Sequence, residues 1–402
     1  MEKAMEHKTG KSTRSVVVLI LCTVIMMAAG FANFKFPPIL TDYLAYYGIE
    51  MGTMSIIMSV FQWICIIAML PVGIFLGKYS PRVTGALGAV CVIAGNIIAI
   101  FAGNIGILVL SRVIEGLGYC ILQVLTQSLV TTAFRDSKAR GSAVGLLNTG
   151  MLFGQMIHYN LAPRVVLSSG LQGVYYYIIG TVAVLTILWL FLIKDEVNVT
   201  DHAEKKDKAE KRKKTLAVYK TRDLWLVALA FSIIRLAVVN VGSYIPAYLS
   251  EVRGLTMVQA SGLLSISTGL GIAALILYGT VSDVLHTKRK VMIFSCLSAM
   301  VVFFLLMKLP IHLIIIFIIL YGTVPRALTT ITFSCYPEIF EDKSLIPVAH
   351  SMVHFIANIV TVIGTIVYGY VIQYMGYDAV WYLVIIFSLA AAVLWIFVRK
   401  VK

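Results

Sequence analysis

Apolar segments, each long enough to cross a lipid bilayer, follow one another along nearly the whole chain. A transmembrane helix needs about 20 predominantly apolar residues. Because the bilayer core offers the backbone no water to bond with, such segments are expected to be helices. We predict twelve spans, at residues 15–38, 52–77, 83–103, 107–133, 142–162, 173–193, 224–249, 258–281, 291–307, 311–334, 347–373 and 379–398. The chain is therefore expected to be an all-α polytopic membrane protein.

The composition excludes several other classes of protein. Of the 402 residues, 59% are hydrophobic and 13% are charged, which is about half the charged fraction of a soluble domain. A soluble enzyme, a disordered chain and a disulfide-stapled secreted domain are thereby excluded. The net charge of +14 does not indicate nucleic acid, because the basic residues lie in short loops. All six cysteines fall inside apolar segments, so we expect buried thiols, no metal site and no cofactor.

The distribution of basic residues predicts the orientation in the membrane. The loops on the side of the amino terminus hold 26 Lys and Arg residues, and the opposite loops hold three. Basic loops stay on the cytoplasmic side, so both termini are expected in the cytoplasm. The first apolar run is longer than the core of a cleavable signal peptide. The compact loops favour the inner membrane of a prokaryotic cell.

One long polar segment divides the predicted spans into two sets of six. Residues 194–223 contain the run KKDKAEKRKK, which has no apolar periodicity and is typical of a solvated linker. The expected organisation is an amino-terminal six-helix bundle at 1–193, a basic cytoplasmic linker at 194–223 and a carboxy-terminal six-helix bundle at 224–402.

Two loops in corresponding positions of the halves have a similar layout. The loop after the second span runs from Gly73 to Arg82, and the loop after the eighth span carries Asp283 and a basic cluster with Arg289. This layout resembles the signature of the major facilitator superfamily, GxxxD followed by a basic cluster. The first loop departs from that signature, since Gly77 stands where the aspartate is usual.

Two further motifs are similar to signatures of the same family. Residues 112–118 read RVIEGLG, which resembles RxxxGxG in the fourth span. The fifth span carries Gly141, Gly150 and Gly154 at the spacing of the family's antiporter motif, with Gln155 where proton-driven drug antiporters have proline. The resemblance implies two pseudo-symmetric bundles, a cavity lined by spans 1, 4, 7 and 10, and gating by the residues of the two loops, Gly73, Arg82, Asp283 and Arg289.

Charged residues inside the spans indicate the substrate. We find Lys35, Arg112, Arg235 and Arg326 against one clear acid, Glu115. A basic residue at the centre of a membrane costs roughly 2.5–3.5 kcal/mol on an insertion scale, so these residues need partners. The four cations lie in spans 1, 4, 7 and 10, and their excess of positive charge predicts an anionic substrate.

Each cation also has a structural interpretation. Arg112 is three residues from Glu115 on the same helix face, which favours a structural ion pair. Arg235 and Arg326 have no acid within their helices, so they either bind substrate or donate to carbonyls and polar side chains. Lys35 lies near a pair of prolines and either lines the cavity or extends to the outer interface.

Neutral polar residues beside these cations are candidates for orienting a substrate or for packing. They are Tyr119, Gln123, Tyr244 and Tyr321. Energy coupling by protons requires a titratable group, for which Glu115 and His354 are the candidates, with His158 and His350 as further histidines in the spans. Entry of a protonated anion or exchange of anions needs no such group.

The sequence thus predicts a secondary transporter that moves a small organic or inorganic anion by alternating access, by proton symport or anion exchange. The alternative is a proton-coupled efflux antiporter for drugs or metabolites, with Glu115 as its essential acid. A sensor without flux is a third hypothesis, and no catalytic constellation indicates an enzyme. The expected partners are a small anion and membrane lipid, with no nucleic acid, and the protein is expected to be a monomer.

Overall fold

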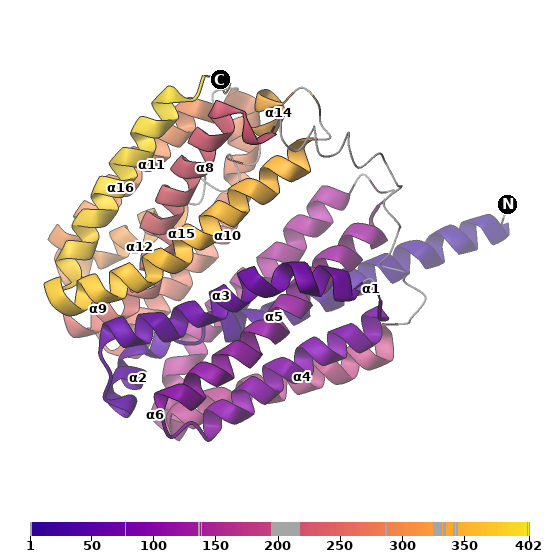
Figure 1. The fold of residues 1–402 in the computed structure, drawn as a ribbon, viewed down its shortest axis with the longest axis horizontal. Coiled ribbons are helices and arrows are strands. Elements are labelled where there is room, and N and C mark those ends of the chain that lie inside the picture. The colour runs from indigo at the N-terminus through magenta and orange to yellow at the C-terminus, as the bar shows by residue number, and fades with distance from the viewer. Residues whose placement is uncertain are drawn as a thin grey trace. The chain divides into compact units, whose positions relative to one another are not determined.

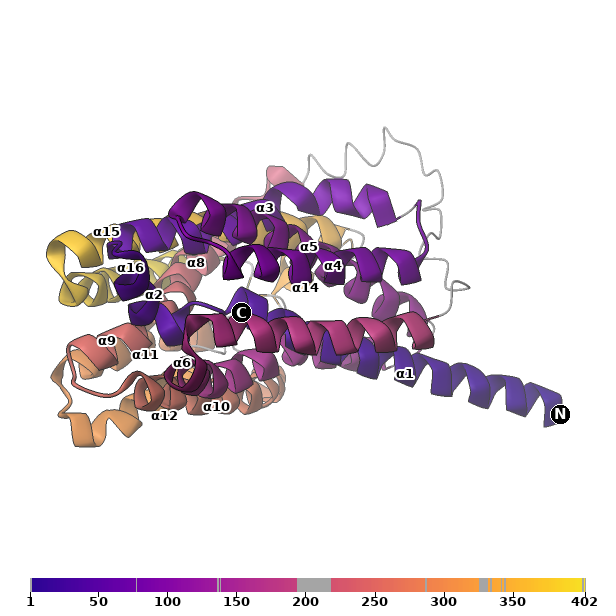
Figure 2. The same ribbon diagram turned by 90° about the horizontal axis from the view of Figure 1, so that it is seen from below.

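The computed structural model describes residues 2–402 except 77, 136, 138, 194–217, 286–287, 325–331, 333–334, 341, 343–344, 400 and 402. The described residues form helices and no strand (Figures 1 and 2). Most of the predicted linker and Arg326 lie outside the described residues.

Contacts between the helices divide the chain into two units. Unit 1 contains residues 1–43 and 60–201, and unit 2 contains residues 44–59 and 202–402. The long helix α3 is thus shared, with its first turns in unit 2 and its remainder in unit 1. The predicted bundle boundaries at 193 and 224 stay a prediction.

Unit 1 holds the first six predicted spans apart from the start of α3. Its elements are α1 (Glu2–Asn33), η1 (Pro37–Ile39), the start of α2 (Leu40–Tyr47), the rest of α3 (Met51–Leu76), α4 (Pro81–Ile100), α5 (Ile105–Ala133) and α6 (Arg140–Leu192). Helix α4 packs along α5, and α1 packs along α6. Asn104 begins α5 by accepting the backbone N–H of Ile107 at 3.0 Å, as is typical of an N-cap residue.

Unit 2 holds the remaining predicted spans. Its elements are α8 (Arg222–Arg235), η2 (Leu236–Asn240), η3 (Val241–Ser243), α9 (Ile245–Glu251), α10 (Met257–Leu285), α11 (Lys288–Lys308), η4 (Ile311–Leu313), α12 (Ile314–Thr323), α14 (Tyr336–Ile339), α15 (Ile346–Met375) and α16 (Tyr377–Phe397). Helix α15 packs against α8, and α11 packs against α16.

The described helices account for the twelve predicted spans. Ten of them are long and apolar enough to cross a membrane. One of these, α6, contains the fifth and sixth predicted spans, which meet at the non-helical residue Gly170 (φ 69°, ψ −177°). The shorter apolar helix α12 lies within the tenth predicted span. The fold is therefore an all-α membrane architecture with twelve spans.

Two predicted spans are interrupted: the seventh, as expected from Pro246, and the first, for which a continuous helix was expected. The first, expected at 15–38, ends as α-helix at Asn33 and is followed by η1 and α2. The seventh, expected at 224–249, changes from α8 to a π-helix at 236–240, then to η3 and α9. Pro37 begins η1 and Pro246 lies in the first turn of α9; proline is tolerated there because the N–H that it lacks has no partner in a first helical turn. Irregular backbone at membrane depth is tolerated where protein surrounds it.

Glycines allow α1 and α6 to approach closely. A Cβ atom on Gly154 would overlap the carbonyl of Met27, and one on Gly150 would lie 2.5 Å from the carbonyl oxygen of Thr23. From the other side, a Cβ atom on Gly30 would lie 2.7 Å from the carbonyl oxygen of Met151. Small residues at such interfaces let helix backbones pack directly. Two glycines of the antiporter-like motif therefore serve helix packing here.

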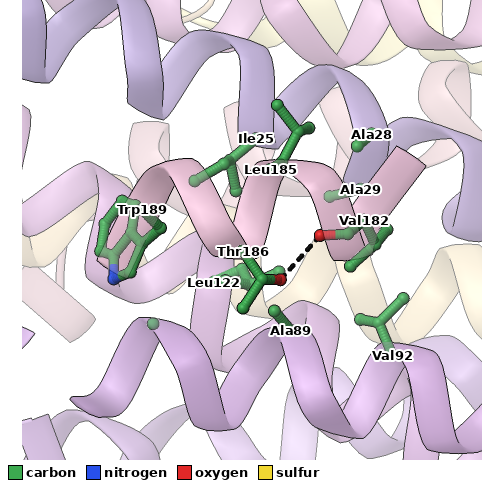
Figure 3. Close-up of a pocket in the computed structure, with 11 residues that line it drawn as sticks. Ile25, Ala28, Ala29, Ala89, Val92, Leu122, Val182, Leu185, Thr186 and Trp189 are labelled. Atoms are coloured by element: carbon green, nitrogen blue, oxygen red, sulfur yellow. Dashed lines mark hydrogen bonds between the residues drawn. The ribbon is translucent and has the colours of Figure 1, made fainter. Parts of the chain in front are cut away.

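A small apolar pocket lies inside unit 1 between α1, α4, α5 and α6 (Figure 3). Ala28, Ala29 and Ala89 leave the space, and Trp189 closes one end. In its lining, Thr186 donates its hydroxyl to the carbonyl of Val182 at 2.7 Å, and the indole N–H of Trp189 donates to the carbonyl of Arg82. The pocket offers no polar group to a ligand, so it is a packing feature.

Candidate functional site

A buried ion cluster lies in unit 1, where the break after α1 faces α4 and α5. The Lys35 ammonium lies 2.6 Å from Oε1 of Glu115, and Arg112 pairs with Oε2 of the same carboxylate. The side chains of Lys35 and Glu115 are 1% and 0% exposed, and Arg112 is equally enclosed. Two cations thus share one carboxylate, which leaves one excess positive charge.

Asn96 of α4 completes this cluster. Its Oδ1 accepts from the Lys35 ammonium at 2.8 Å, and its Nδ2 donates to Oε1 of Glu115 at 2.8 Å. The amide therefore satisfies both charges, as buried charges require. We name Lys35, Asn96, Arg112 and Glu115 the Lys35 cluster. Asn96 was not among the predicted site residues, although an amide inside the apolar span predicted at 83–103 was a signal for it.

Aromatic rings enclose the Arg112 guanidinium from two directions. Its Cζ lies 4.4 Å from the ring centre of Phe61 and 4.7 Å from that of Phe36, distances typical of cation–π contacts. Its Nη1 also donates to the carbonyl of Ala32 at 3.1 Å. Its Nε is buried without a hydrogen-bond partner, so this arginine keeps one unused donor inside the protein.

Lys35 is buried, which bears on whether it extends to the outer interface, while its place in the cavity wall stays a prediction. Lys35 was expected in the first helix. It lies instead in the non-helical residues that follow Asn33. Its ammonium points inward and also lies 5.1 Å from the ring centre of Tyr175. The prediction that the Lys35 side chain extends into the lipid headgroups is therefore wrong.

Tyr119 and Gln123 lie on α5, one and two turns beyond Glu115. The Tyr119 hydroxyl lies 3.1 Å from the sulfur of Met151, and its ring packs 5.0 Å from that of Phe61. Gln123 is half-buried. These contacts place Tyr119 next to the aromatic enclosure of Arg112.

Unit 2 contains a second cation among polar side chains. Arg235, at the end of α8, donates from Nη1 to Oδ1 of Asn358 on α15 at 3.0 Å, and its side chain is half-buried. Asn358 was not among the predicted site residues. The nearby Asn240 donates from Nδ2 to Oγ1 of Thr365 at 3.2 Å. The polar side chains of α15 thus face the irregular part of the seventh span.

The two candidate tyrosines of unit 2 donate to backbone carbonyls. The Tyr244 hydroxyl donates to Thr365 at 2.7 Å, and the Tyr321 hydroxyl donates to Val238, inside the π-helix, at 2.9 Å. Val238 lies in the irregular part of the seventh span, whereas Thr365 lies inside the continuous helix α15. A further part in substrate binding stays a prediction for both residues.

His354 lies on α15, one turn before Asn358. Its ring centre is 4.5 Å from that of His350 and 6.1 Å from that of Phe231, and the ring is half-buried. Among the described residues, no three His, Cys, Asp or Glu side chains are grouped to hold a metal ion.

The predicted gating residues have different environments. Gly73 and Arg82 are exposed, and the carbonyl of Arg82 accepts the indole N–H of Trp189 at 3.2 Å. Arg289 donates to the carbonyls of Trp395 and Ile396 at the end of α16. This contact satisfies carbonyls that end a helix without partners.

Two other predicted residues have no described side chain. Asp283 lies in α10, but its side chain is outside the described atoms, and Arg326 lies outside the described residues altogether. Their roles stay predictions.

Comparison with known proteins gives the family of this architecture. The profile described as Major Facilitator Superfamily matches residues 19–344. A bacterial homologue of the human lysosomal transporter Spinster, inward-facing and unoccupied, superposes with a TM-score of 0.78 at 12% identity, covering 96% of this chain and 98% of that chain. The nucleoside transporter NupG gives 0.76 at 14% identity, covering 97% and 100%. A D-xylose-proton symporter gives 0.77 at 14% identity, covering 96% and 98%. At these identities the structures establish the fold.

Proposed function

The chain belongs to the major facilitator superfamily, and we propose that it is a secondary transporter that moves a small anion by alternating access. Membership of this family supports a role in transport across a membrane, and not a role as an enzyme. The choice of an anion is the proposal, and it comes from the charges of this chain alone.

The observation that carries the proposal is the charge balance of the Lys35 cluster. Lys35 and Arg112 face a single carboxylate, and all three groups are almost fully enclosed. An unpaired positive charge in a medium of low dielectric is costly. A bound monoanion would neutralise this charge. The Nε–H of Arg112, which has no hydrogen-bond partner, is a donor to which a carboxylate could bind.

Arg235 supports the same sign of substrate in unit 2. Its guanidinium donates to the neutral amide oxygen of Asn358 at 3.0 Å, and a guanidinium presents paired donors that fit a carboxylate. Arg326 and His354 complete the proposed set, with Arg326 as a second cation and His354 as a proton acceptor for symport. Exchange of one anion for another remains the alternative form of coupling.

Alternating access then follows from a difference in affinity. A ligand shifts a conformational equilibrium only if it binds one conformation better than the other. An anion that neutralises the buried cations lowers the electrostatic cost of the conformation in which they are most enclosed. We propose that Gly73, Arg82, Asp283 and Arg289 act in gating, and that the protein works as a monomer in an inner membrane with both termini in the cytoplasm.

The efflux alternative assigns proton transport to Glu115. That carboxylate already contacts two cations and the amide of Asn96, so it serves as the counter-ion of the cluster. The contacts support a fixed structural charge better than a proton carrier, and anion transport is therefore preferred.

Thermal unfolding of the purified protein in detergent tests the proposal. The ligands are mono- and dicarboxylates, inorganic anions and lipophilic cations. A ligand of the native state at 100 times its dissociation constant stabilises by about 2.7 kcal/mol. We expect one class of anion to raise the unfolding temperature, and we expect Arg235→Gln and Lys35→Met to abolish the increase.

Arg164→Gln is the matched control, because Arg164 is exposed and donates to Asn160 within its own helix. Anion stabilisation should survive in this variant. Stabilisation by lipophilic cations alone, retained in Arg235→Gln and Lys35→Met, would replace anion transport with the efflux alternative. The stabilising anion would then be tested for uptake into proteoliposomes.

A further inference from the structure

The backbone at the break after α1 leaves the carbonyl of Lys35 without its normal helical partners. In a helix this oxygen would accept an N–H from the residue three or four positions later. Pro38 has no N–H, and the N–H of Ile39 donates to the carbonyl of Phe36 at 3.0 Å. Because Lys35 is buried, its carbonyl needs a partner from another part of the chain.

His158 of α6 provides this partner. Its Nε2 lies 3.1 Å from the carbonyl oxygen of Lys35, and the imidazole is 0% exposed. A carbonyl oxygen only accepts, so Nε2 must carry the hydrogen. The geometry at this one oxygen therefore fixes which ring nitrogen is protonated.

The other ring nitrogen has a partner of the complementary kind. Nδ1 of His158 contacts the hydroxyl of Tyr177, which donates to it when Nδ1 is unprotonated. The ring is also stacked on Phe31 of α1, at 5.9 Å between ring centres and 28° between planes. A neutral ring with hydrogen on Nε2 satisfies both hydrogen bonds, so proton transfer is not required to explain this histidine.

Residues from both sides of the kink at Gly170 in α6 contact the non-helical segment that follows α1. His158 lies before Gly170 and binds the main chain of Lys35. Tyr177 lies after Gly170 and orients the imidazole, while Tyr175 lies beneath the ammonium. The hydroxyl of Tyr175 is in turn 2.5 Å from that of Tyr43 in α2. The main chain and the side chain of Lys35 are therefore fixed by separate groups.

We propose that His158, oriented by Tyr177, is a neutral positioning residue that fixes the carbonyl of Lys35 and thereby places the Lys35 ammonium for anion binding. This inference rests on the proposed function for its effect on the substrate. It assigns His158 a hydrogen-bonding role in place of the proton-coupling role that a histidine in a span suggests.

Isosteric substitutions test the proposal, because the amide nitrogen of glutamine lies near the position of Nε2 and that of asparagine near Nδ1. His158→Gln keeps a donor to the Lys35 carbonyl. It should keep the KM within about threefold of the parent for the carboxylate or inorganic anion that stabilises the parent protein in thermal unfolding. His158→Asn loses that donor and should raise KM about tenfold, the size of one hydrogen bond, with kcat little changed. His312→Asn is the control, since His312 is exposed in η4.

An equal KM in His158→Gln and His158→Asn would overturn the proposal. A lower kcat with unchanged KM in both variants would also overturn it. A purely structural role would lower the yield and the unfolding temperature of both variants without the difference in KM. Tyr177→Phe should give a smaller increase in KM than His158→Asn, because it removes only the group that orients the ring.

A second measurement does not depend on the substrate. Nitrogen-15 NMR of histidine-labelled protein, with His158→Gln to assign the signal, should show a protonated Nε2 and an unprotonated Nδ1. The opposite tautomer or a doubly protonated ring would overturn the inference. If no anion binds the parent protein, the proposed function fails, and the tautomer alone decides whether His158 holds the Lys35 carbonyl.

Discussion

Lys35 and Glu115 form an ion pair with an N–O distance of 2.6 Å, although one lies in the break after α1 and the other lies in the middle of α5. Arg112 contacts the second oxygen of the same carboxylate. The Glu115 carboxylate therefore pairs with two cations from different parts of the fold. Removing its charge would leave both cations without a counter-ion.

The first prediction follows from this unequal sharing. Glu115→Gln leaves two buried cations without a counter-ion and should destabilise the protein by about 3–5 kcal/mol, the usual cost of breaking a buried ion pair from one side. Lys35→Met leaves the neutral pair of Arg112 and Glu115 and should cost less. Thermal unfolding in detergent measures both, and a larger loss in Lys35→Met would contradict the charge balance described here.

The second prediction concerns the contact of α1 with α6. Gly154→Ala would push a methyl group into the carbonyl of Met27 and should cost about 1–3 kcal/mol, as overpacking does. Gly145 lies in the same helix, where a Cβ atom would meet nothing within 4 Å, and it is exposed. Gly145→Ala should therefore leave the unfolding temperature unchanged or raise it, because alanine favours helix.

The third prediction concerns the bond of Arg235 to Asn358. Asn358→Asp would place a carboxylate against the arginine, and this carboxylate would compete with a substrate anion. We expect the apparent affinity for the anion to fall at least about tenfold, or about 1.4 kcal/mol, while the empty protein becomes no less stable. Asn358→Gln keeps a neutral acceptor and is the control. Unchanged anion affinity in Asn358→Asp would remove Arg235 from the proposed binding residues.

The fourth prediction concerns Trp189, which closes the apolar pocket (Figure 3). It is 1% exposed and donates to the carbonyl of Arg82. Trp189→Ala should cost about 3–5 kcal/mol through the cavity that it leaves. Trp225 also donates to a carbonyl, that of Tyr219, but it is 41% exposed. Trp225→Ala should cost much less in the same unfolding measurement.

The sequence predicted the helical spans well because their signal is local. The start of the third span is an example, since the prediction at 83 and the observed start at Pro81 differ by two residues. The interruption of the seventh span was expected from Pro246, but that of the first span was not, because apolar composition continues through it. Pro37 and Pro246 were signals for both breaks, but whether a proline ends, bends or starts a helix depends on which groups satisfy the released carbonyls.

The candidate site was predicted in part. Arg112 and Glu115 are three residues apart on one helix, and this spacing alone places them on the same face, where the structure pairs them. Asn96 and Asn358 were missed because each meets its cation across a helix interface. The distance between two residues along the sequence does not predict a contact between side chains of different helices.

By itself, the sequence determined the fold class, the family and the excess of positive charge within the spans, since all three depend on composition and short motifs. Only the tertiary structure decided which charges are paired. It brought Lys35 to Glu115, enclosed Arg112 between two aromatic rings and set His158 against the carbonyl of Lys35. The physical reason is that the strength of an ionic contact depends on distance and on the exclusion of water, and packing of separate helices sets both.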